Sequence, residues 1–563
     1  MDSVNSFKGY GKVDELEEAA FRRKTRRRFI ILSISLVVLI VLIIGVVAGT
    51  LARRNRSGEV PASPTSSSAA IKSLCSVTEY PESCFASLKA SNSTNPDEIF
   101  RLSLTVVMDS LEKLSSFPDE LAKRTEEPRV KAALKVCGTV LNDAVSVLND
   151  SISSVSEDGG KVAVDDLKTW LSAVVTDQET CIDALEEVNS TFTGEVKHLM
   201  KNSTEFASNS LAIVSKVLGI LGGFKVPIHR RLLGAPFPEW TAAGDRRLLQ
   251  EFAPPPNVTV AADGSGDVRT IKEAVDLIPK KSESRFVIHV KAGTYVENVV
   301  LDKSRWNVMI YGDGQDTTII SGSKNFVDGT PTFETATFAV AGKGFMARDI
   351  TFKNTAGAAK HQAVAFRSGS DQSILYRCTF DAFQDTLYAH SNRQFYRECN
   401  ITGTIDFIFG NSAVVFQKCA ILPRQPLPNQ FVTITAQGKK DPNQNSGIAI
   451  QRCTMAPLDA LTAPTYLGRP WKDFSTTVVM ETEIGGFLHP KGWISWVANV
   501  DPPESISYGE FRNAGPGSNT TGRVSWVGYR PRMSDAEAGK YSVQRFIEGA
   551  SWLPGKSVTY EPN

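Results

Sequence analysis

The chain carries almost no net charge, because its 62 lysines and arginines face 61 aspartates and glutamates, a balance of +1 at pH 7. This argues against a general binder of polyanions such as nucleic acid. A G-x-S-x-G nucleophile elbow is absent, which disfavours a serine esterase. Cysteine is scarce, and the cysteines of the N-terminal half have neither C-x-x-C spacing nor a nearby histidine, which disfavours zinc. We expect neither a metal nor a cofactor.

Long hydrophobic runs are also rare, and a single one is long enough to cross a membrane. Residues 22–28 read RRKTRRR, and the uncharged residues 29–51 follow directly. This run is longer than the apolar core of a cleaved signal peptide, and six basic residues precede it. We therefore predict a cytoplasmic basic tail at 1–28, a transmembrane signal anchor at 29–51 and a luminal remainder that begins with a flexible linker at 52–70.

Apolar residues recur at helical spacing in the next region, residues 71–225. Four stretches keep one apolar face each, and they begin near Leu104, Val130, Leu167 and Leu211. Short connections between them imply an antiparallel bundle, so this region is predicted to be an all-α four-helix domain.

Four of the eight cysteines lie in this helical region, and in a luminal compartment they should form disulfides. We favour Cys75 with Cys84 and Cys137 with Cys181 among the three pairings that the sequence allows.

Glycosylation sequons support the same luminal topology. Two of the eight sequons are disfavoured, Asn55 by its closeness to the membrane and Asn400 by its place inside a repeat. The predicted acceptors are the remaining six, Asn92, Asn149, Asn189, Asn202, Asn257 and Asn519.

Residues 226–256 form an irregular linker in which the tetrapeptide Arg-Arg-Leu-Leu occurs twice, sixteen residues apart. A single dibasic pair is usually only a solvated surface, but two identical copies in a Pro- and Gly-bearing linker suggest protease sites. We predict processing of a proprotein by a subtilisin-like protease, so that the mature chain begins near Leu248 or Gln250. The basic residues concerned are Arg230, Arg231, Arg246 and Arg247.

From residue 257 onward the pattern changes to short β-branched runs separated by Gly, Asp and Asn. Two segments repeat each other at an offset of 21 residues: Cys378 and Asp385 in one correspond to Cys399 and Asp406 in the next. Related runs end at Cys419 and Cys453. A recurring unit of this length predicts a β-solenoid, in which each coil buries its apolar face by stacking on its neighbours.

Stacking brings equivalent residues of adjacent coils to about 4.8 Å from each other. Asp385 and Asp406 should therefore lie one above the other, and two carboxylates so close should divide into a charged nucleophile or base and a protonated acid. The same register places cysteines at a separation suited to disulfides. Pairing of Cys378 with Cys399 and of Cys419 with Cys453 is expected, with Cys399 to Cys419 as an open alternative.

Five motifs in order carry a family resemblance, namely GTYVE (293–297), QAVA (362–365), QDTL (384–387) with DFIFGN (406–411), and LGRPW (467–471). Together they resemble the plant pectinesterases (pectin methylesterases) over essentially all of residues 257–563. The helical region, with its C-x8-C start, looks like the pectinesterase and invertase inhibitor family. The whole chain thus resembles a long pectinesterase precursor.

This resemblance implies a mainly β fold: a right-handed parallel β-helix at 257–563, preceded by the four-helix pro-domain and the N-terminal transmembrane helix. It also implies residue roles. Asp406 would be the nucleophile, Asp385 the general acid and then base, and Gln362 with Gln384 the oxyanion donors. Arg469 would orient the nucleophile and contribute to substrate binding. Trp471 and Thr332 would contact the substrate.

The implied activity is hydrolysis of pectin methyl esters to methanol and free carboxylates in the cell wall, by a secreted glycoprotein enzyme. A polysaccharide lyase or galacturonase on the same fold is the alternative enzyme, and a binding protein acting through its inhibitor-like bundle is the alternative from another class. Expected partners are methyl-esterified homogalacturonan, the processing protease and a proteinaceous pectinesterase inhibitor, with membrane contact limited to the precursor's anchor. The bundle is expected either to cover the groove as the pro-region of a zymogen or to aid folding and sorting.

Overall fold

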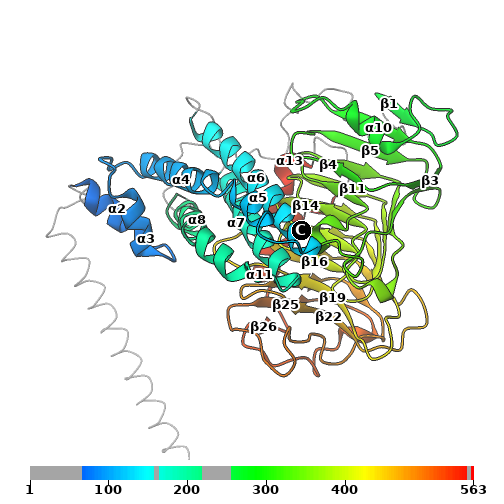
Figure 1. Cartoon of the computed structure of the whole chain (residues 1–563). Helices are drawn as coiled ribbons and strands as arrows, with labels where there is room; N and C mark the ends of the chain where they lie inside the picture. Colours follow the sequence, from blue (N-terminus) through cyan, green and yellow to red (C-terminus); the bar gives the residue numbers. More distant parts are fainter. Residues whose placement is uncertain (1–65, 157–163, 219–254, 554–559, 563) are drawn as a thin grey trace, which may run out of the picture. The chain divides into compact units, whose positions relative to one another are not determined.

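The computed structural model describes residues 66–156, 164–218, 255–553 and 560–562, drawn in colour in Figure 1. Within these ranges no helix is long and apolar enough to cross a membrane. The predicted anchor at 29–51 and the four arginines of the predicted processing sites lie outside the described residues.

The helical region forms a bundle that begins slightly earlier than predicted, at Ser67. Pro96 starts its helix at a position where a missing N–H costs nothing, and the Asn95 side chain caps the same end by accepting from Asp97 N. The helices are α2 (Ser67–Cys75), α3 (Pro81–Leu88), α4 (Pro96–Glu112), α5 (Phe117–Ala122), α6 (Pro128–Ser156), α7 (Val164–Glu187) and α8 (Thr193–Ile213), followed by the π-helical turn η1 (Val214–Leu218).

Two disulfides tie the bundle together, with the pairing that the sequence favoured. Cys75 bonds Cys84 between α2 and α3, and Cys137 bonds Cys181 between α6 and α7. The second bond joins the two longest helices, so it fixes α7 against α6.

The second half of the chain is a parallel solenoid of three sheets (Figure 1). The coils from β2 to β22 each contribute one strand to each sheet. Sheet A consists of β1 (Val258–Val260), β2 (Phe286–Val290), β5 (Val308–Gly312), β8 (Met346–Arg348), β11 (Ser373–Tyr376), β14 (Arg393–Arg397), β17 (Ala413–Gln417), β20 (Gly447–Gln451), β23 (Thr476–Met480), β25 (Ser507–Phe511) and β26 (Tyr529–Arg530).

Sheets B and C complete the coils. Sheet B consists of β3 (Gly293–Val296), β6 (Thr318–Gly322), β9 (Thr351–Asn354), β12 (Thr379–Asp381), β15 (Asn400–Gly403), β18 (Ala420–Pro423), β21 (Thr454–Met455) and β24 (Glu483–Ile484). Sheet C consists of β4 (Val299–Leu301), β7 (Phe338–Val340), β10 (Phe366–Ser368), β13 (Leu387–Ala389), β16 (Ile408–Gly410), β19 (Val432–Gln437) and β22 (Thr465–Pro470).

Short helices border this solenoid. α10 (Ile271–Asp276) carries a capping box between Thr270 and Glu273 and packs on the solenoid core. The others, all near the C-terminus or in turns, are α11 (Asp535–Ala538), α12 (Val543–Phe546), α13 (Gly549–Trp552) and the 3-10 turns η2 (Thr332–Glu334), η3 (Ala358–Lys360), η4 (Pro516–Ser518) and η5 (Gly539–Tyr541).

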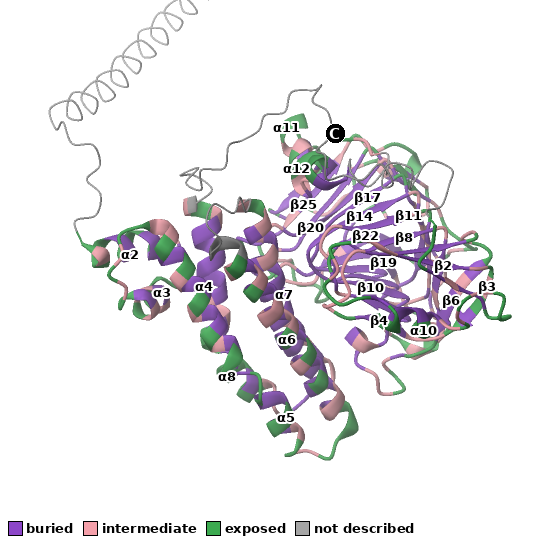
Figure 2. Ribbon diagram, turned by 90° about the horizontal axis from the view of Figure 1, so that it is seen from above, coloured by how far each residue is buried: buried purple, intermediate pink, exposed green. Residues whose placement is uncertain are grey.

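The interior of the solenoid is a column of stacked apolar side chains. Phe352 stacks on Phe380 of the next coil with ring centroids 5.7 Å apart, and Phe338 stacks on Phe366 at 6.0 Å. Figure 2 shows the strands as buried almost throughout, whereas the helices alternate buried and exposed faces. Burial of like residues in register is what holds successive coils together.

The predicted register is confirmed. Leu387 pairs with Ile408 and Thr379 pairs with Asn400, so the 21-residue offset carries each residue onto its counterpart one coil away. Asp385 therefore lies over Asp406, and Cys378 over Cys399.

The predicted disulfides of the solenoid, in contrast, are wrong. Cys378, Cys399, Cys419 and Cys453 are buried free thiols on adjacent coils. Parallel in-register strands keep neighbouring Cβ atoms at about the 4.8 Å strand spacing, wider than the roughly 3.8 Å that a disulfide prefers. The thiols instead donate to backbone carbonyls, as Cys399 does to Leu375 O at 3.4 Å.

Candidate active site

The two aspartates lie in equivalent turns, just before β13 and β16 of sheet C. Both have left-handed backbones, with φ of 61° at Asp385 and 52° at Asp406, a conformation that costs free energy in any residue with a Cβ. The N–H of Asp385 donates to Ile405 O at 3.0 Å, which ties one turn to the next. The turns thus aim both carboxyl groups at the outer face of sheet C.

Asp406 is held by two side chains from neighbouring strands. Arg469 donates to it with a fork, Nε to Oδ1 at 2.9 Å and a terminal nitrogen to Oδ2 at 2.5 Å. Thr433 donates from Oγ1 to Asp406 Oδ1 at 2.6 Å and accepts from the Asp406 N–H at 2.9 Å. A carboxylate that accepts charge-assisted bonds on both oxygens is fixed in orientation.

Asp385 has the opposite environment. Burial, and then the negative charge of Asp406, raise the pKa of Asp385 well above its usual value, and only Arg469 opposes the shift. The pair is therefore divided as the stacked register predicted, with one carboxyl group held by a cation and the other favouring its proton.

The pair opens into a cavity of about 400 Å³ on the outer face of sheet C. Every side chain that the sequence singled out for chemistry or substrate contact lines this cavity. The set comprises Thr332, Gln362, Gln384, Asp385, Asp406, Arg469 and Trp471. Gln362 and Gln384 come from the turns before β10 and β13, so their amide groups lie on the same edge of sheet C as the two aspartates.

Aromatic residues that the sequence reasoning missed complete the walls. Tyr388 and Phe409 stack with ring centroids 4.1 Å apart, and each follows its aspartate by three residues, so the repeat itself held the signal. Trp496 stacks on Trp471 at 6.2 Å and lies 4.1 Å from the Arg469 guanidinium. No repeat marks Trp496, because its loop follows β24 outside the regular coils.

Helix α7 of the bundle closes the cavity from the other side. The Glu187 carboxylate accepts from Thr332 N at 3.1 Å and from the Thr332 hydroxyl. Asp183 forms an ion pair with Lys472, and Thr180 Oγ1 lies 2.9 Å from His390 Nε2. Burial raises the pKa of Glu187 to about 7 and that of Asp183 to about 6. Both donors of Thr332, its N–H and its hydroxyl, are thus engaged by Glu187.

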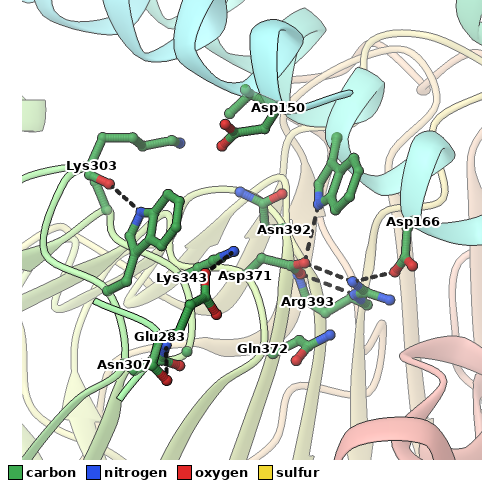
Figure 3. A pocket seen from close by; sticks show the side chains of 15 residues that line it. Asp150, Asp166, Glu283, Lys303, Asn307, Lys343, Asp371, Gln372, Asn392 and Arg393 are labelled. Atoms are coloured by element: carbon green, nitrogen blue, oxygen red, sulfur yellow. Dashed lines mark hydrogen bonds and ion pairs between the residues drawn. The ribbon is translucent and has the colours of Figure 1, made fainter. Parts of the chain in front are cut away.

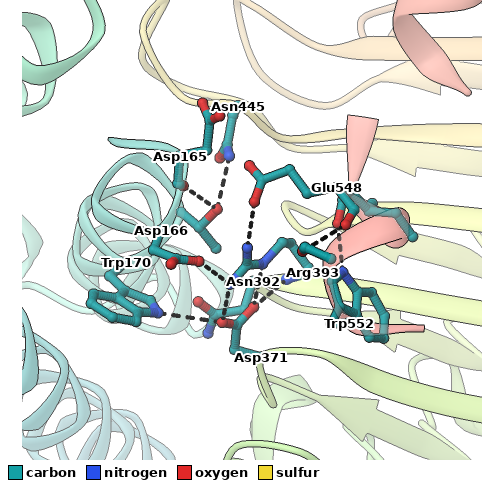
Figure 4. A network of polar contacts seen from close by, with 12 residues as sticks. Asp165, Asp166, Trp170, Asp371, Asn392, Arg393, Asn445, Glu548 and Trp552 are labelled. Carbon is teal, nitrogen blue, oxygen red and sulfur yellow. Dashed lines mark hydrogen bonds and ion pairs between the residues drawn. The ribbon is translucent and has the colours of Figure 1, made fainter. Parts of the chain in front are cut away.

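A second cavity, of about 310 Å³, lies farther along the same bundle face (Figure 3). None of the residues predicted for chemistry lines it. Its charged residues are largely paired: Arg393 contacts Asp371 at 2.6 Å, Asp166 of α7 at 2.7 Å and Glu548 of the C-terminal region at 2.8 Å (Figure 4). This network joins the solenoid, helix α7 and the C-terminal region, so we interpret it as a structural contact.

The other predicted positions lie apart from the cavity. The six asparagines predicted for glycosylation are all exposed. Among the described residues there is no group of three or more His, Cys, Asp or Glu side chains arranged to hold a metal ion.

Comparison with known proteins matches each half of the chain to a family model. The family model described as Pectinesterase matches residues 257–550, and the model described as Plant invertase/pectin methylesterase inhibitor matches residues 69–213. Pectinesterase 1 of Arabidopsis thaliana is 58% identical, with 99% of each chain covered, and pectinesterase 3 of Phaseolus vulgaris is 57% identical, with 100% of each covered.

One solved structure is similar enough to compare in detail. Pectin methylesterase from carrot is 50% identical, with a TM-score of 0.54, and it covers 56% of this chain and 100% of its own. A protein that corresponds to the solenoid alone therefore folds without a bundle.

Proposed function

The chain belongs to the pectinesterase family, and from this premise we propose how its residues carry out the reaction. The protein is a carboxylic ester hydrolase, a pectin methylesterase that converts methyl esters of pectin to methanol and free carboxylates. The lyase, galacturonase and non-catalytic alternatives that the sequence left open do not fit this family.

In the first step the ionised carboxylate of Asp406 attacks the carbonyl carbon of a galacturonate methyl ester. Its two hydrogen-bonding partners, Arg469 and Thr433, support this role because they keep one oxygen lone pair directed at the cavity. The carbonyl oxygen gains negative charge, and the amide N–H groups of Gln362 and Gln384 would donate to it without titrating themselves.

Asp385 serves next as general acid. Its raised pKa supports a protonated state, from which it transfers the proton to the departing methoxy oxygen, so that methanol leaves and an acyl-enzyme anhydride with Asp406 remains. Asp385, now ionised, takes a proton from a water molecule. The resulting hydroxide attacks the anhydride, which releases the polymer carboxylate and restores both aspartates.

The observation that carries this proposal is the stacked pair itself, with Arg469 held on Asp406 and no cation directly on Asp385 among the described residues. The test is methanol release from methyl-esterified pectin by a chain that begins at Gln250, in the presence of a chelator. Asp406→Ala and Asp385→Asn should each lower kcat by about 10²–10⁴-fold, and the parent should keep its activity with the chelator. A variant with parent-like activity would contradict the role given to that residue.

We extend the proposal to the precursor. The basic tail and apolar run at 1–51 would anchor it in the secretory membrane, and cleavage after the Arg-Arg pairs at 230–231 or 246–247 would release a glycosylated enzyme to the cell wall. The contact of Glu187 with Thr332 supports a pro-region that keeps the enzyme silent until then.

A further inference from the structure

A row of side chains crosses the outer face of sheet C beside the aspartates. Backbone pairing aligns Arg367 with Tyr388, Tyr388 with Phe409, Phe409 with Ala436, and Ala436 with Arg469. An arginine thus lies on each side of the aromatic pair Tyr388 and Phe409 in this row, which continues beyond Arg367 to Ala339. Arg469 forms an ion pair with Asp406, whereas Arg367 has no ion-pair partner among the described residues.

Arg367 is an unusual arginine because the Nε of its guanidinium is buried without a polar partner. Its side chain is 7% exposed and lies over the Phe333 ring at 3.5 Å. Within the described part of the chain it makes no ion pair or hydrogen bond, and its Nε is one of the buried polar atoms left without a partner. Burial lowers the pKa of Arg367 to about 10, so it still carries its charge at neutral pH.

The bundle packs on the solenoid face that surrounds Arg367. Phe333, Tyr388 and Phe409 pack in one cluster with the apolar core of the helices. Asp143 of α6 and Asp177 of α7, together with Glu334 of the solenoid, act on Arg367 through their charge without forming a hydrogen bond to it. Asp177 also has an oxygen without a partner. The bundle thus faces this arginine with negative charge but leaves its donors unsatisfied.

An unsatisfied buried guanidinium destabilises a fold, so a purely structural role would be expected to supply a partner from the solenoid. Five N–H donors in a planar fork fit a carboxylate, and a neighbouring aromatic face fits a sugar ring. β10 is two strands from β16, which places Arg367 about 10 Å from the catalytic turn along the row. A polymer lying across the strands would reach both places at once.

We propose that, once the bundle has left the groove, Arg367 binds the free carboxylate of a galacturonate unit other than the one whose ester reacts. This proposal rests on the pectin methylesterase function given above and assigns to that site a preference for chains that are already partly de-esterified. Such a preference would favour continued reaction near earlier product.

The test compares Arg367→Gln with the parent enzyme, both beginning at Gln250, on two substrates: fully methyl-esterified pectin and half-esterified pectin. Initial rates of methanol release give kcat and KM. On the half-esterified polymer we expect KM to rise about ten-fold with kcat unchanged, since a charge-assisted contact to bound substrate is lost. On the fully esterified polymer KM should stay within about two-fold. Arg512→Gln, which removes an exposed arginine paired with Asp535, is the matched control and should behave as the parent on both.

An unchanged KM on the half-esterified polymer, or an equal rise on both polymers, would overturn the proposal. A parent enzyme without activity on either polymer would instead contradict the proposed function. If Arg367→Gln does not fold, Arg367→Lys keeps the charge and loses the fork, and the same selective rise in KM, about three-fold, is expected of it. An Arg367→Lys variant whose KM changes equally on both polymers would also overturn the proposed carboxylate-binding role of Arg367.

Discussion

At the scale of single residues, chemistry is decided by small differences between two aspartates in equivalent turns. Both are buried and both have left-handed backbones. Asp406, however, accepts hydrogen bonds from the side chains of Arg469 and Thr433, whereas Asp385 accepts from neither. The difference arises because Thr433 and Arg469 come from later coils of sheet C, beyond β16, and reach only the nearer aspartate.

Thr433 offers a residue-scale prediction, because it touches the nucleophile but not the substrate. Thr433→Val keeps the shape of the side chain and removes the 2.6 Å bond to Asp406 Oδ1, so Asp406 can rotate from its attacking position. We expect kcat for methanol release to fall about ten-fold with KM unchanged. Thr433→Ser restores the hydroxyl and should recover most of the rate. Parent-like kcat in the valine variant, or no recovery with serine, would exclude this positioning role.

At the scale of elements, α7 is built to lie on sheet C. Contact residues that are small or acidic recur along it every three or four positions, and Trp170 adds a hydrogen bond to Asp371. The small or acidic ones are Thr169, Ser172, Thr176, Thr180, Asp183 and Glu187. They meet amides and hydroxyls of the solenoid, as in the 2.9 Å bond from Asn411 Nδ2 to Thr176 Oγ1 and the 2.9 Å bond from Asn445 Nδ2 to Thr169 Oγ1. One helical face thus forms a polar contact stripe, whereas the opposite face packs into the bundle.

Docking of α7 should depend on pH, and Glu187 is one of the carboxyl groups that contribute. Its usual pKa of 4.5 rises to about 7 in the docked state, because burial disfavours the charged form. The docked state therefore binds more protons, so docking is strongest below the undocked pKa and weakens as pH rises toward 7. We expect the separated bundle to bind the solenoid up to about a hundred-fold more weakly at pH 8 than at pH 5, as measured by calorimetric titration.

Substitutions separate this effect from general pH sensitivity. Glu187→Gln removes one titrating group and should reduce the pH dependence, while Asp183 and Asp177, whose pKa values burial also raises, leave a residual slope. Glu112→Gln, which alters an exposed acid on α4, should leave the slope intact. An affinity that rises with pH in the parent would show that the buried carboxylate does not control docking.

At the scale of the whole molecule, the bundle and the proposed active site belong to one chain and contact each other. The bundle contacts the solenoid at Thr332, Lys472 and Arg393, so the contact extends from the catalytic cavity to the C-terminal region. Such an extended contact would keep the groove closed while both halves belong to one chain, because a linked partner acts at a high effective concentration.

This arrangement gives a prediction for the precursor. With both Arg pairs changed to Ala, at 230–231 and 246–247, the chain should remain full-length within the secretory pathway and release little methanol from pectin. Immunoblotting of the secreted fraction, together with a methanol assay, measures both outcomes. Changing the dibasic pair Arg53–Arg54 is the control and should not alter secretion. Secretion and activity equal to those of the parent would mean that cleavage at these sites is not required.

Most of the solenoid and its site could be predicted from sequence, because a solenoid converts sequence offset into position. The 21 residues between Asp385 and Asp406 are one coil, and the pairing of Leu387 with Ile408 confirms it. The same rule failed for the cysteines, since stacking in register brings thiols near but holds their Cβ atoms too far apart to bond. Trp496 escaped prediction because it lies outside the repeat.

The sequence by itself determined what is local or periodic: the helices of the bundle, the coils and the stacked carboxylates. It favoured the two bundle disulfides, which the structure then confirmed. Only the tertiary structure decided which surfaces meet. Glu187 contacts Thr332 across 145 residues of chain, and nothing periodic connects them. The reason is physical, because docking of α7 on sheet C depends on the shape and charge of two surfaces that form only after each half has folded. The buried, unpaired state of Arg367 follows from that same contact.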